Sequence, residues 1–365
     1  MTRVLTAAIA TVAALALAGG TALATPTDPA PPASSATTVS AVTDRLAAQV
    51  AAALADRGLR DRAASAAASA PVDLLAFTAD TALAEATRTA NQSVLAAKGL
   101  PPNSGSLLRL RVATDTMRIG LSRGEVPLVA AAPTDDDATS VTAYDPRGGR
   151  LTLDPATPPK RPVLVVEVDV AKALPLGLDL MRKTLSARGL TAPRPLTTTR
   201  SSGGYWATKV NAIRLSDDAE PWVKGSAEIY SVVGGFGLDG KATVTIVQMP
   251  YLDNDGTTYY PNQLLAHFSA YKYNLADVVM MEDDGDTNYQ QLAQAIITAL
   301  LTIADAGTYI PLVNAILSAI PASWWTDDPD YVDSWYTLST STTGHLNGAR
   351  GNGWMDVTPY WVSEL

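Results

Sequence analysis

The sequence predicts an α+β protein in which a helical, mixed N-terminal region precedes an antiparallel β-sandwich with a helical insertion. All seven tryptophans and 12 of the 13 tyrosines lie from Tyr205 onward. Acidic residues outnumber basic residues by 19 to 6 in 205–365, whereas 1–204 carries 17 acidic and 21 basic residues. Apolar residues also change from helical spacing near the start to strand-like alternation after 205. These shifts predict two regions that are built differently.

The first 24 residues have the three parts of a secretory signal peptide. A short basic start precedes an apolar run over 4–17, and Ala-Leu-Ala at 22–24 is a small-residue cleavage site. The apolar run is too short to span a membrane. We therefore expect a secreted protein without a transmembrane segment in its mature chain. Residues 25–37 are rich in Pro, Ser and Thr and predict a disordered leader.

Residues 38–189 predict an α+β N-terminal domain. Apolar residues at helical spacing indicate a first helix that Gly58 ends and a second helix from Pro71 to just before Gly99. Apolar sequence and alternation predict strands over 108–112 and 163–168 and two short strands joined by a turn over 140–153. A helix is expected over 175–188, where Gly189 would cap its end. Residues 190–204 are rich in Pro, Thr, Ser and Gly and predict a linker.

Residues 205–365 predict the β-sandwich, because short aromatic strands at this spacing are typical of two packed sheets. Seven strands are expected, over 208–215, 225–233, 241–249, 264–268, 276–281, 331–339 and 354–362. A helical insertion over 288–320 interrupts them, with helices near 288–304 and 309–320. The two insertion helices are very apolar, but each is too short to span a membrane, so we expect buried core helices.

Four acidic segments of the sandwich are the candidate functional feature. They hold 13 of the 19 acidic residues in 205–365 and lie at 217–220, 253–255, 282–286 and 327–333. Crowded carboxylates repel one another, and calcium takes six to eight oxygen ligands, so a bound calcium ion would relieve the repulsion. The predicted metal ligands are Asp217, Asp218, Glu220, Glu282, Asp283, Asp284, Asp286, Asp328 and Asp330. The alternative is that these residues form ordinary solvated turns.

The acidic pattern resembles the synaptotagmin-like calcium-binding sandwiches, in which acidic loops at one end of two sheets share ions. The resemblance rests on Asp217-Asp218 after the first strand and on Glu282-Asp283-Asp284 after a later apolar strand. The helical insertion over 288–320 departs from that family.

Four longer runs resemble a secreted bacterial family catalogued only as a domain of unknown function. They are PVLVVEVD, IRLSDDAEPWVKGSAEIY, MPYLDNDGTTYYPNQLL and EDDGDTNYQQLA. The resemblance covers roughly 40–365 and implies secretion and this architecture, but no catalytic activity.

Enzyme signals are sparse. The chain has no cysteine and only two histidines, His267 and His345, which excludes thiol chemistry and three-histidine zinc sites. We expect His267 to be a hydrogen-bonded structural histidine and Trp324, Trp325 and Trp335 to pack the sandwich. Paired carboxylates need no histidine to hydrolyse a glycosidic bond, so a secreted hydrolase acting on glycans remains the alternative function.

The expected function is a secreted calcium-binding structural or binding module, with no motif that specifies catalysis. An acidic aromatic domain would repel phosphates, so nucleic acid is excluded as a partner, while a membrane surface or a glycan stays open. Glu228, placed by alternation in the strand 225–233, has two interpretations. It is either a solvated strand residue or a further ligand beside 217–220.

Overall fold

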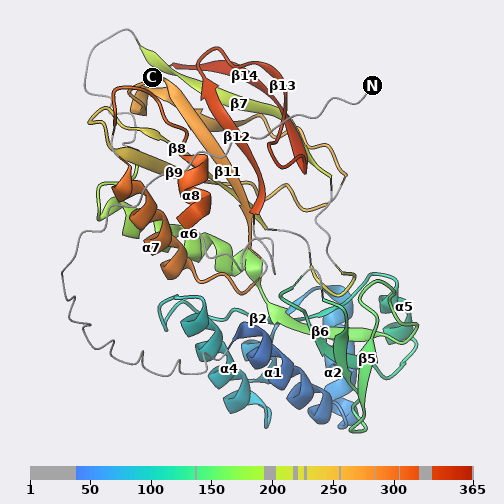
Figure 1. Ribbon diagram of the computed structural model, residues 1–365. Helices are drawn as coiled ribbons and strands as arrows, with labels where there is room; N and C mark the ends of the chain where they lie inside the picture. The colour runs from blue at the N-terminus through green and yellow to red at the C-terminus, as the bar shows by residue number, and fades with distance from the viewer. Residues whose placement is uncertain are drawn as a thin grey trace, which may run out of the picture. The chain divides into compact units, whose positions relative to one another are not determined.

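A computed structural model describes residues 38–135, 138–192, 203–216, 221–225, 228–254, 256–283, 285–303, 305–319 and 331–363 (Figure 1). These residues belong to one compact unit that spans Thr37–Leu365. Helices and antiparallel sheets follow each other in the predicted order, so the α+β class is confirmed. The predicted signal peptide (1–24) and leader (25–37) lie outside the described residues and stay predictions.

The N-terminal region is built from short helices around one sheet. Its elements are α1 (Val39–Ala53), α2 (Arg57–Ser69), β1 (Val72–Asp73), α3 (Leu74–Thr78), α4 (Ala84–Ala97), β2 (Leu108–Val112), α5 (Met117–Ser122), β3 (Leu128–Ala131), β4 (Val141–Tyr144), β5 (Arg150–Leu153), β6 (Val163–Val168) and α6 (Val170–Ser186). The strands form sheet A in the order β1-β2-β6-β3-β4-β5, with only β3 and β6 parallel. All six residues of β6 are buried, which explains why its sequence is apolar apart from Glu167.

Helix α1 covers sheet A through the apolar stripe that the sequence predicts. Val42, Leu46 and Val50 recur every four residues on one face of α1 and are buried. The helix contacts β3, β4 and β6. This packing forms the core of the N-terminal region.

Two predicted helix boundaries are wrong, for the same physical reason. Gly58 lies inside α2 rather than ending a helix, because the Asp56 carboxylate accepts a backbone hydrogen bond of 2.7 Å and starts a new helix there. Asp73 does the same for α3, accepting from the Ala76 N–H at 3.1 Å. The predicted helix over 71–98 is therefore divided into β1, α3 and α4.

The predicted β-sandwich is present as two four-stranded antiparallel sheets. Its strands are β7 (Gly204–Leu215), β8 (Ile229–Phe236), β9 (Ala242–Gln248), β10 (Gln263–His267), β11 (Leu275–Glu282), β12 (Tyr331–Ser339), β13 (Gly344–Asn347) and β14 (Gly353–Ser363), with a short 3-10 helix η1 (Phe268–Ala270) after β10. Sheet B has the order β12-β11-β8-β9, and sheet C has the order β10-β7-β14-β13. The seven expected strands are confirmed, whereas β13 lies in a glycine-rich run and was not predicted.

The space between sheets B and C is filled by apolar side chains from both. Val210 and Met355 of sheet C and Val278 of sheet B are 0% exposed and belong to one core cluster. Trp335 is part of the same cluster, and its indole N–H donates to the Leu346 carbonyl at 3.2 Å. The expected packing role of Trp335 is confirmed, whereas Trp324 and Trp325 lie outside the described residues.

A layer of helices covers the other face of sheet B. The insertion forms α7 (Tyr289–Thr302) and α8 (Val313–Ala319), and Figure 1 shows both, with α6, beside β8, β9 and β11. Val279 of β11 shares one core cluster with Leu178 of α6 and Ile296 of α7. Among the described helices, none is long and apolar enough to cross a membrane. Residues 193–202 of the predicted linker lie outside the described part, so a domain boundary there stays a prediction.

Candidate functional site

One end of the sandwich collects the strand ends that adjoin the four acidic segments. Strand register shows this through pairs at matching ends: Leu215 with Gly353, Ile229 with Glu282, Tyr230 with Gln248, and Met281 with Tyr331. The two sheets meet at this end, because the Asp333 carboxylate of β12 accepts the Gly353 N–H of β14 at 2.9 Å. We call it the acidic end of the sandwich. In the sequence, 217–220, 253–255, 282–286 and 327–333 each lie next to one of these strand ends.

Asp333 organises the glycine-rich run instead of facing solvent. Its side chain is 0% exposed and accepts backbone N–H groups from Arg350 (2.8 Å) and Asn352 (2.9 Å), besides Gly353. A Cβ on Gly348 would overlap the Asp333 carboxylate. The 348–353 turn is therefore wrapped around one buried carboxylate, which explains the glycine at 348.

Three of the nine predicted metal ligands are described. Glu282 and Asp283 are buried at 4% and 2% exposure, and Asp286 is half-buried. Within the described part of the chain, no group of three or more His, Asp or Glu side chains is placed to hold a metal ion. The other six predicted ligands lie outside that part, namely Asp217, Asp218, Glu220, Asp284, Asp328 and Asp330. The calcium site therefore stays a prediction.

Asp283 already has a cation beside it. The Lys98 ammonium, from the end of α4, lies 3.1 Å from its Oδ1, and both side chains are 0% exposed. Tyr289 donates its hydroxyl to the same carboxylate, and the Gly285 N–H donates to it at 2.9 Å. Burial and the Asp283 charge hold the pKa of the Tyr289 hydroxyl well above its ordinary value. These contacts argue against Asp283 as a calcium ligand.

Sequence reasoning missed Lys98 as the partner of Asp283. A lysine directly before Gly99 fits the usual preference for a cation at a helix C-terminus, where it needs no distant partner. No pattern in the sequence links it to a residue so far along the chain. Only packing of α4 against the β11–α7 segment brings the two together.

Two arginines share one carboxylate on sheet A. Register places Arg109 of β2 opposite Glu167 of β6, and the Nε atoms of Arg109 and Arg111 lie 2.5 and 2.8 Å from Glu167 Oε1. Arg109 also pairs with Asp169 at 3.2 Å. Arg111 donates to the Val223 carbonyl at 2.7 Å, which ties sheet A to the segment before β8. A signal for this network is present in the sequence. Arg109 and Arg111 alternate with apolar residues in one strand, and Glu167 is the single acidic residue of another.

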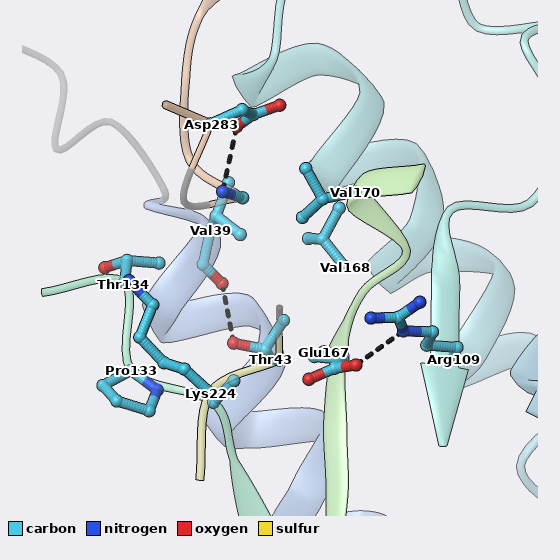
Figure 2. A pocket seen from close by; sticks show the side chains of 13 residues that line it. Val39, Thr43, Arg109, Pro133, Thr134, Glu167, Val168, Val170, Lys224 and Asp283 are labelled. Carbon is cyan, nitrogen blue, oxygen red and sulfur yellow. Dashed lines mark hydrogen bonds and ion pairs between the residues drawn. The ribbon is translucent and has the colours of Figure 1, made fainter. Parts of the chain in front are cut away.

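A small cavity lies between this network and Asp283. It has a volume of about 40 Å³, and its lining includes Thr43, Arg109, Glu167, Lys224 and Asp283. Figure 2 shows Arg109 and Glu167 facing each other on one side, and Asp283 toward the Val39 end. A cavity of this size has room for a water molecule or a monatomic ion but not for an organic substrate.

Glu228 is neither in the middle of a strand nor fully solvated. It precedes the first residue of β8, is half-buried, and its backbone carbonyl accepts the Asp283 N–H at 3.2 Å. Burial raises the pKa of Glu228 to about 7, and the charge of Arg109 opposes this rise. Three carboxylates add to the rise in pKa: Asp283, Asp169 and Asp253. Glu228 thus lies near three other carboxylates and one arginine.

The two histidines lie in different surroundings, and His267 differs from the expected structural histidine. His345 is exposed, with Nδ1 3.2 Å from the Asp356 carboxylate and its ring beside Trp354. His267 is half-buried, and its buried Nδ1 has no hydrogen-bond partner among the described residues, so the expectation of a hydrogen-bonded structural histidine is wrong. Burial also lowers the pKa of His267.

The fold and this site define an α+β protein whose antiparallel sandwich brings together, at one end, the strand ends next to its acidic segments. Over residues 41–364 the chain matches the family described as "Protein of unknown function (DUF3103)", and it belongs to that family. No curated protein matches the chain. No solved structure matches it either, so the likeness to synaptotagmin-like sandwiches stays a prediction.

Proposed function

We propose that this protein is a secreted calcium-binding module that acts by binding rather than by catalysis. The observation that carries the proposal is the acidic end, where register brings together strand ends next to four acidic segments. Calcium takes six to eight oxygen ligands, so it suits carboxylates that several loops contribute. The signal-peptide pattern of the first 24 residues supports export.

The charge around Glu228 supports the same proposal. Burial raises its pKa to about 7, and the charges of Asp283, Asp169 and Asp253 add to the rise while Arg109 opposes it. A divalent cation would stabilise the ionised form of Glu228 and so lower that pKa. Because Asp283 is paired with Lys98, the proposal takes its ligands from the other eight predicted residues and Glu228.

Calorimetry on the mature chain, stripped of metal with a chelator, tests calcium binding directly. We expect a dissociation constant of about 10⁻⁴ to 10⁻³ M, as in other extracellular modules, and a melting temperature that rises by several degrees at saturation. Affinity should increase from pH 6 to pH 8, because Glu228 must lose its proton to bind. Repeating the titration in buffers of different ionisation enthalpy should reveal proton release at pH 7.

Two variants sharpen the calcium test. Glu228→Gln should weaken calcium binding roughly tenfold, or about 1.4 kcal/mol, and abolish the proton release. Glu85→Gln is the matched control, because Glu85 lies on the exposed face of α4, far from Glu228 in the sequence. This variant should change neither the calcium affinity nor the proton release. A melting curve that calcium leaves unchanged would overturn the proposal.

The raised pKa of Glu228 also favours the second candidate function, a glycan hydrolase. A carboxyl that keeps its proton near pH 7 is what a general acid needs, and other carboxyl groups are close by. A panel of aryl glycosides tests this reading. Hydrolysis that Glu228→Gln abolishes, without any calcium dependence, would replace the binding module by a hydrolase.

A further inference from the structure

A second, larger cavity lies at the end of the sandwich opposite the acidic end. It has a volume of about 760 Å³ and is bounded by α6, by the edge strands β9 and β10, and by the start of β7. Register separates the two ends, since Leu215 of β7 pairs with Gly353 whereas Tyr205 pairs with Val362 at the other end of β14. Cavities of 300–1,000 Å³ are typical of small-molecule sites.

The walls of this cavity suit a flat, apolar ring system. Tyr205 and His267 form one wall, with ring centroids 5.5 Å apart and an angle of 56° between the rings. Aliphatic side chains of α6 and β9 also line it, including Leu185 and Ile246. Aromatic and aliphatic walls bind planar ligands through surface burial and ring contacts.

The polar groups of the cavity favour an anion. Arg182 lines the cavity, and one nitrogen of its guanidinium donates to the Ile246 carbonyl at 3.1 Å, which orients the group. Among the described residues no carboxylate pairs with Arg182, and no acidic residue lines the cavity. The strands of the cavity come from 205–365, where acidic residues outnumber basic ones by 19 to 6, yet none of those acidic residues lines it.

His267 contributes the face of its ring to the cavity. Its Nδ1 is fully buried and has no hydrogen-bond partner among the described residues, so a bound molecule cannot reach this atom. The guanidinium of Arg182 is therefore the polar anchor for a bound molecule.

From these observations we propose that this cavity binds a small organic anion with a planar ring system, such as an aromatic carboxylate. The ring lies against Tyr205 and His267, and the carboxylate pairs with the exposed guanidinium of Arg182. This site is separate from the acidic end and independent of calcium.

Naphthalene-2-carboxylate and its uncharged analogue naphthalene-2-carboxamide are the probes, titrated by calorimetry into the mature chain with chelator present. We expect the carboxylate to bind about tenfold more tightly than the amide. Arg182→Gln should remove that difference by weakening the carboxylate alone. Arg188→Gln, an exposed arginine just beyond α6 that does not line the cavity, is the matched control and should leave both affinities unchanged.

A second variant locates the bound probe. Ser186 is exposed on the last turn of α6 and lines the cavity, so Ser186→Trp should obstruct it and abolish binding of both probes without unfolding the chain. The proposal is overturned if the wild-type chain binds neither probe, as when another part of the chain fills the cavity. It is equally overturned if Ser186→Trp leaves binding intact, or if Arg182→Gln fails to separate the carboxylate from the amide.

Discussion

Lys98 and Asp283 lie 185 residues apart in the sequence and form an ion pair in which both side chains are fully buried. Two hydrogen bonds to backbone carbonyls reinforce the junction. The Tyr289 N–H donates to the Lys98 carbonyl at 3.1 Å, and the Asn288 side-chain amide donates to the Ala97 carbonyl at 2.7 Å. The end of α4 is thereby joined to the start of α7. This junction links the N-terminal region to the sandwich.

Removing one partner of this ion pair should be strongly destabilising. Lys98→Met leaves the Asp283 charge buried without its cation, and we expect the free energy of unfolding to fall by about 3–5 kcal/mol. The double variant Lys98→Met/Asp283→Asn should recover part of that loss. Urea denaturation measures both effects.

An exposed ion pair provides the control for this variant. Arg57 and Asp61 are 3.6 Å apart on α2, with side chains 86% and 65% exposed. Arg57→Met should therefore change stability by less than about 0.5 kcal/mol. If Lys98→Met lowers the free energy of unfolding by no more than Arg57→Met does, the buried ion pair contributes little to stability.

Glu228 should make stability fall as pH rises between about 4.5 and 7. Its folded pKa is raised to about 7, from 4.5 for an unperturbed glutamate, so in that window the folded state holds a proton that the unfolded state has lost. Glu228→Gln should therefore stabilise the calcium-free protein by about 1–2 kcal/mol at pH 8, allowing for solvent screening of a half-buried carboxyl. At pH 4.5 the two proteins should be alike. Thermal melts at the two pH values give the comparison, and an equal stabilisation at both would refute this prediction.

Gly177 is a helix glycine whose substitution by alanine should destabilise the protein. Alanine normally favours a helix by about 0.5–1 kcal/mol over glycine. At this position, however, a Cβ would overlap the Tyr289 ring that packs on α6. We expect Gly177→Ala to cost about 1–3 kcal/mol by overpacking. In a Tyr289→Ala background the same change should become neutral or stabilising, and a cost that persists there would exclude the ring as its cause.

Asp333 should be essential to the order of the 348–353 turn. Asp333→Asn puts an NH₂ group against backbone N–H donors such as those of Asn352 and Gly353, and we expect a loss of about 2–4 kcal/mol. Asp356→Asn is the control, because that half-buried carboxylate contacts the exposed His345 rather than a row of backbone N–H groups. Chemical denaturation compares the two variants. Similar small losses in both would mean that the turn does not depend on the buried carboxylate.

Much of the fold was predictable because its elements follow local patterns. The strand over 163–168 was located from its apolar run, since burial on both faces requires near-continuous hydrophobicity. The insertion helices were located from their apolar composition, which the buried face of α7 requires. Helix starts at Asp56 and Asp73 were missed, because a capping carboxylate competes with the glycine and proline signals next to it. Strand β13 was missed because its sequence is exposed and rich in glycine.

The sequence by itself determined the α+β class, the order of the two regions, and the acidic character of the second. Those properties depend on residues close together in the chain, where periodicity, turn residues and charge density have local effects. Tertiary structure alone decided that Lys98 neutralises Asp283, that two arginines share Glu167, and that an arginine and a half-buried histidine line an acid-free cavity. Such pairings depend on strand register and helix packing between residues far apart in the chain. A charged side chain has the same local sequence signature whether it faces solvent or is buried against a partner, so only the packed structure distinguishes the two.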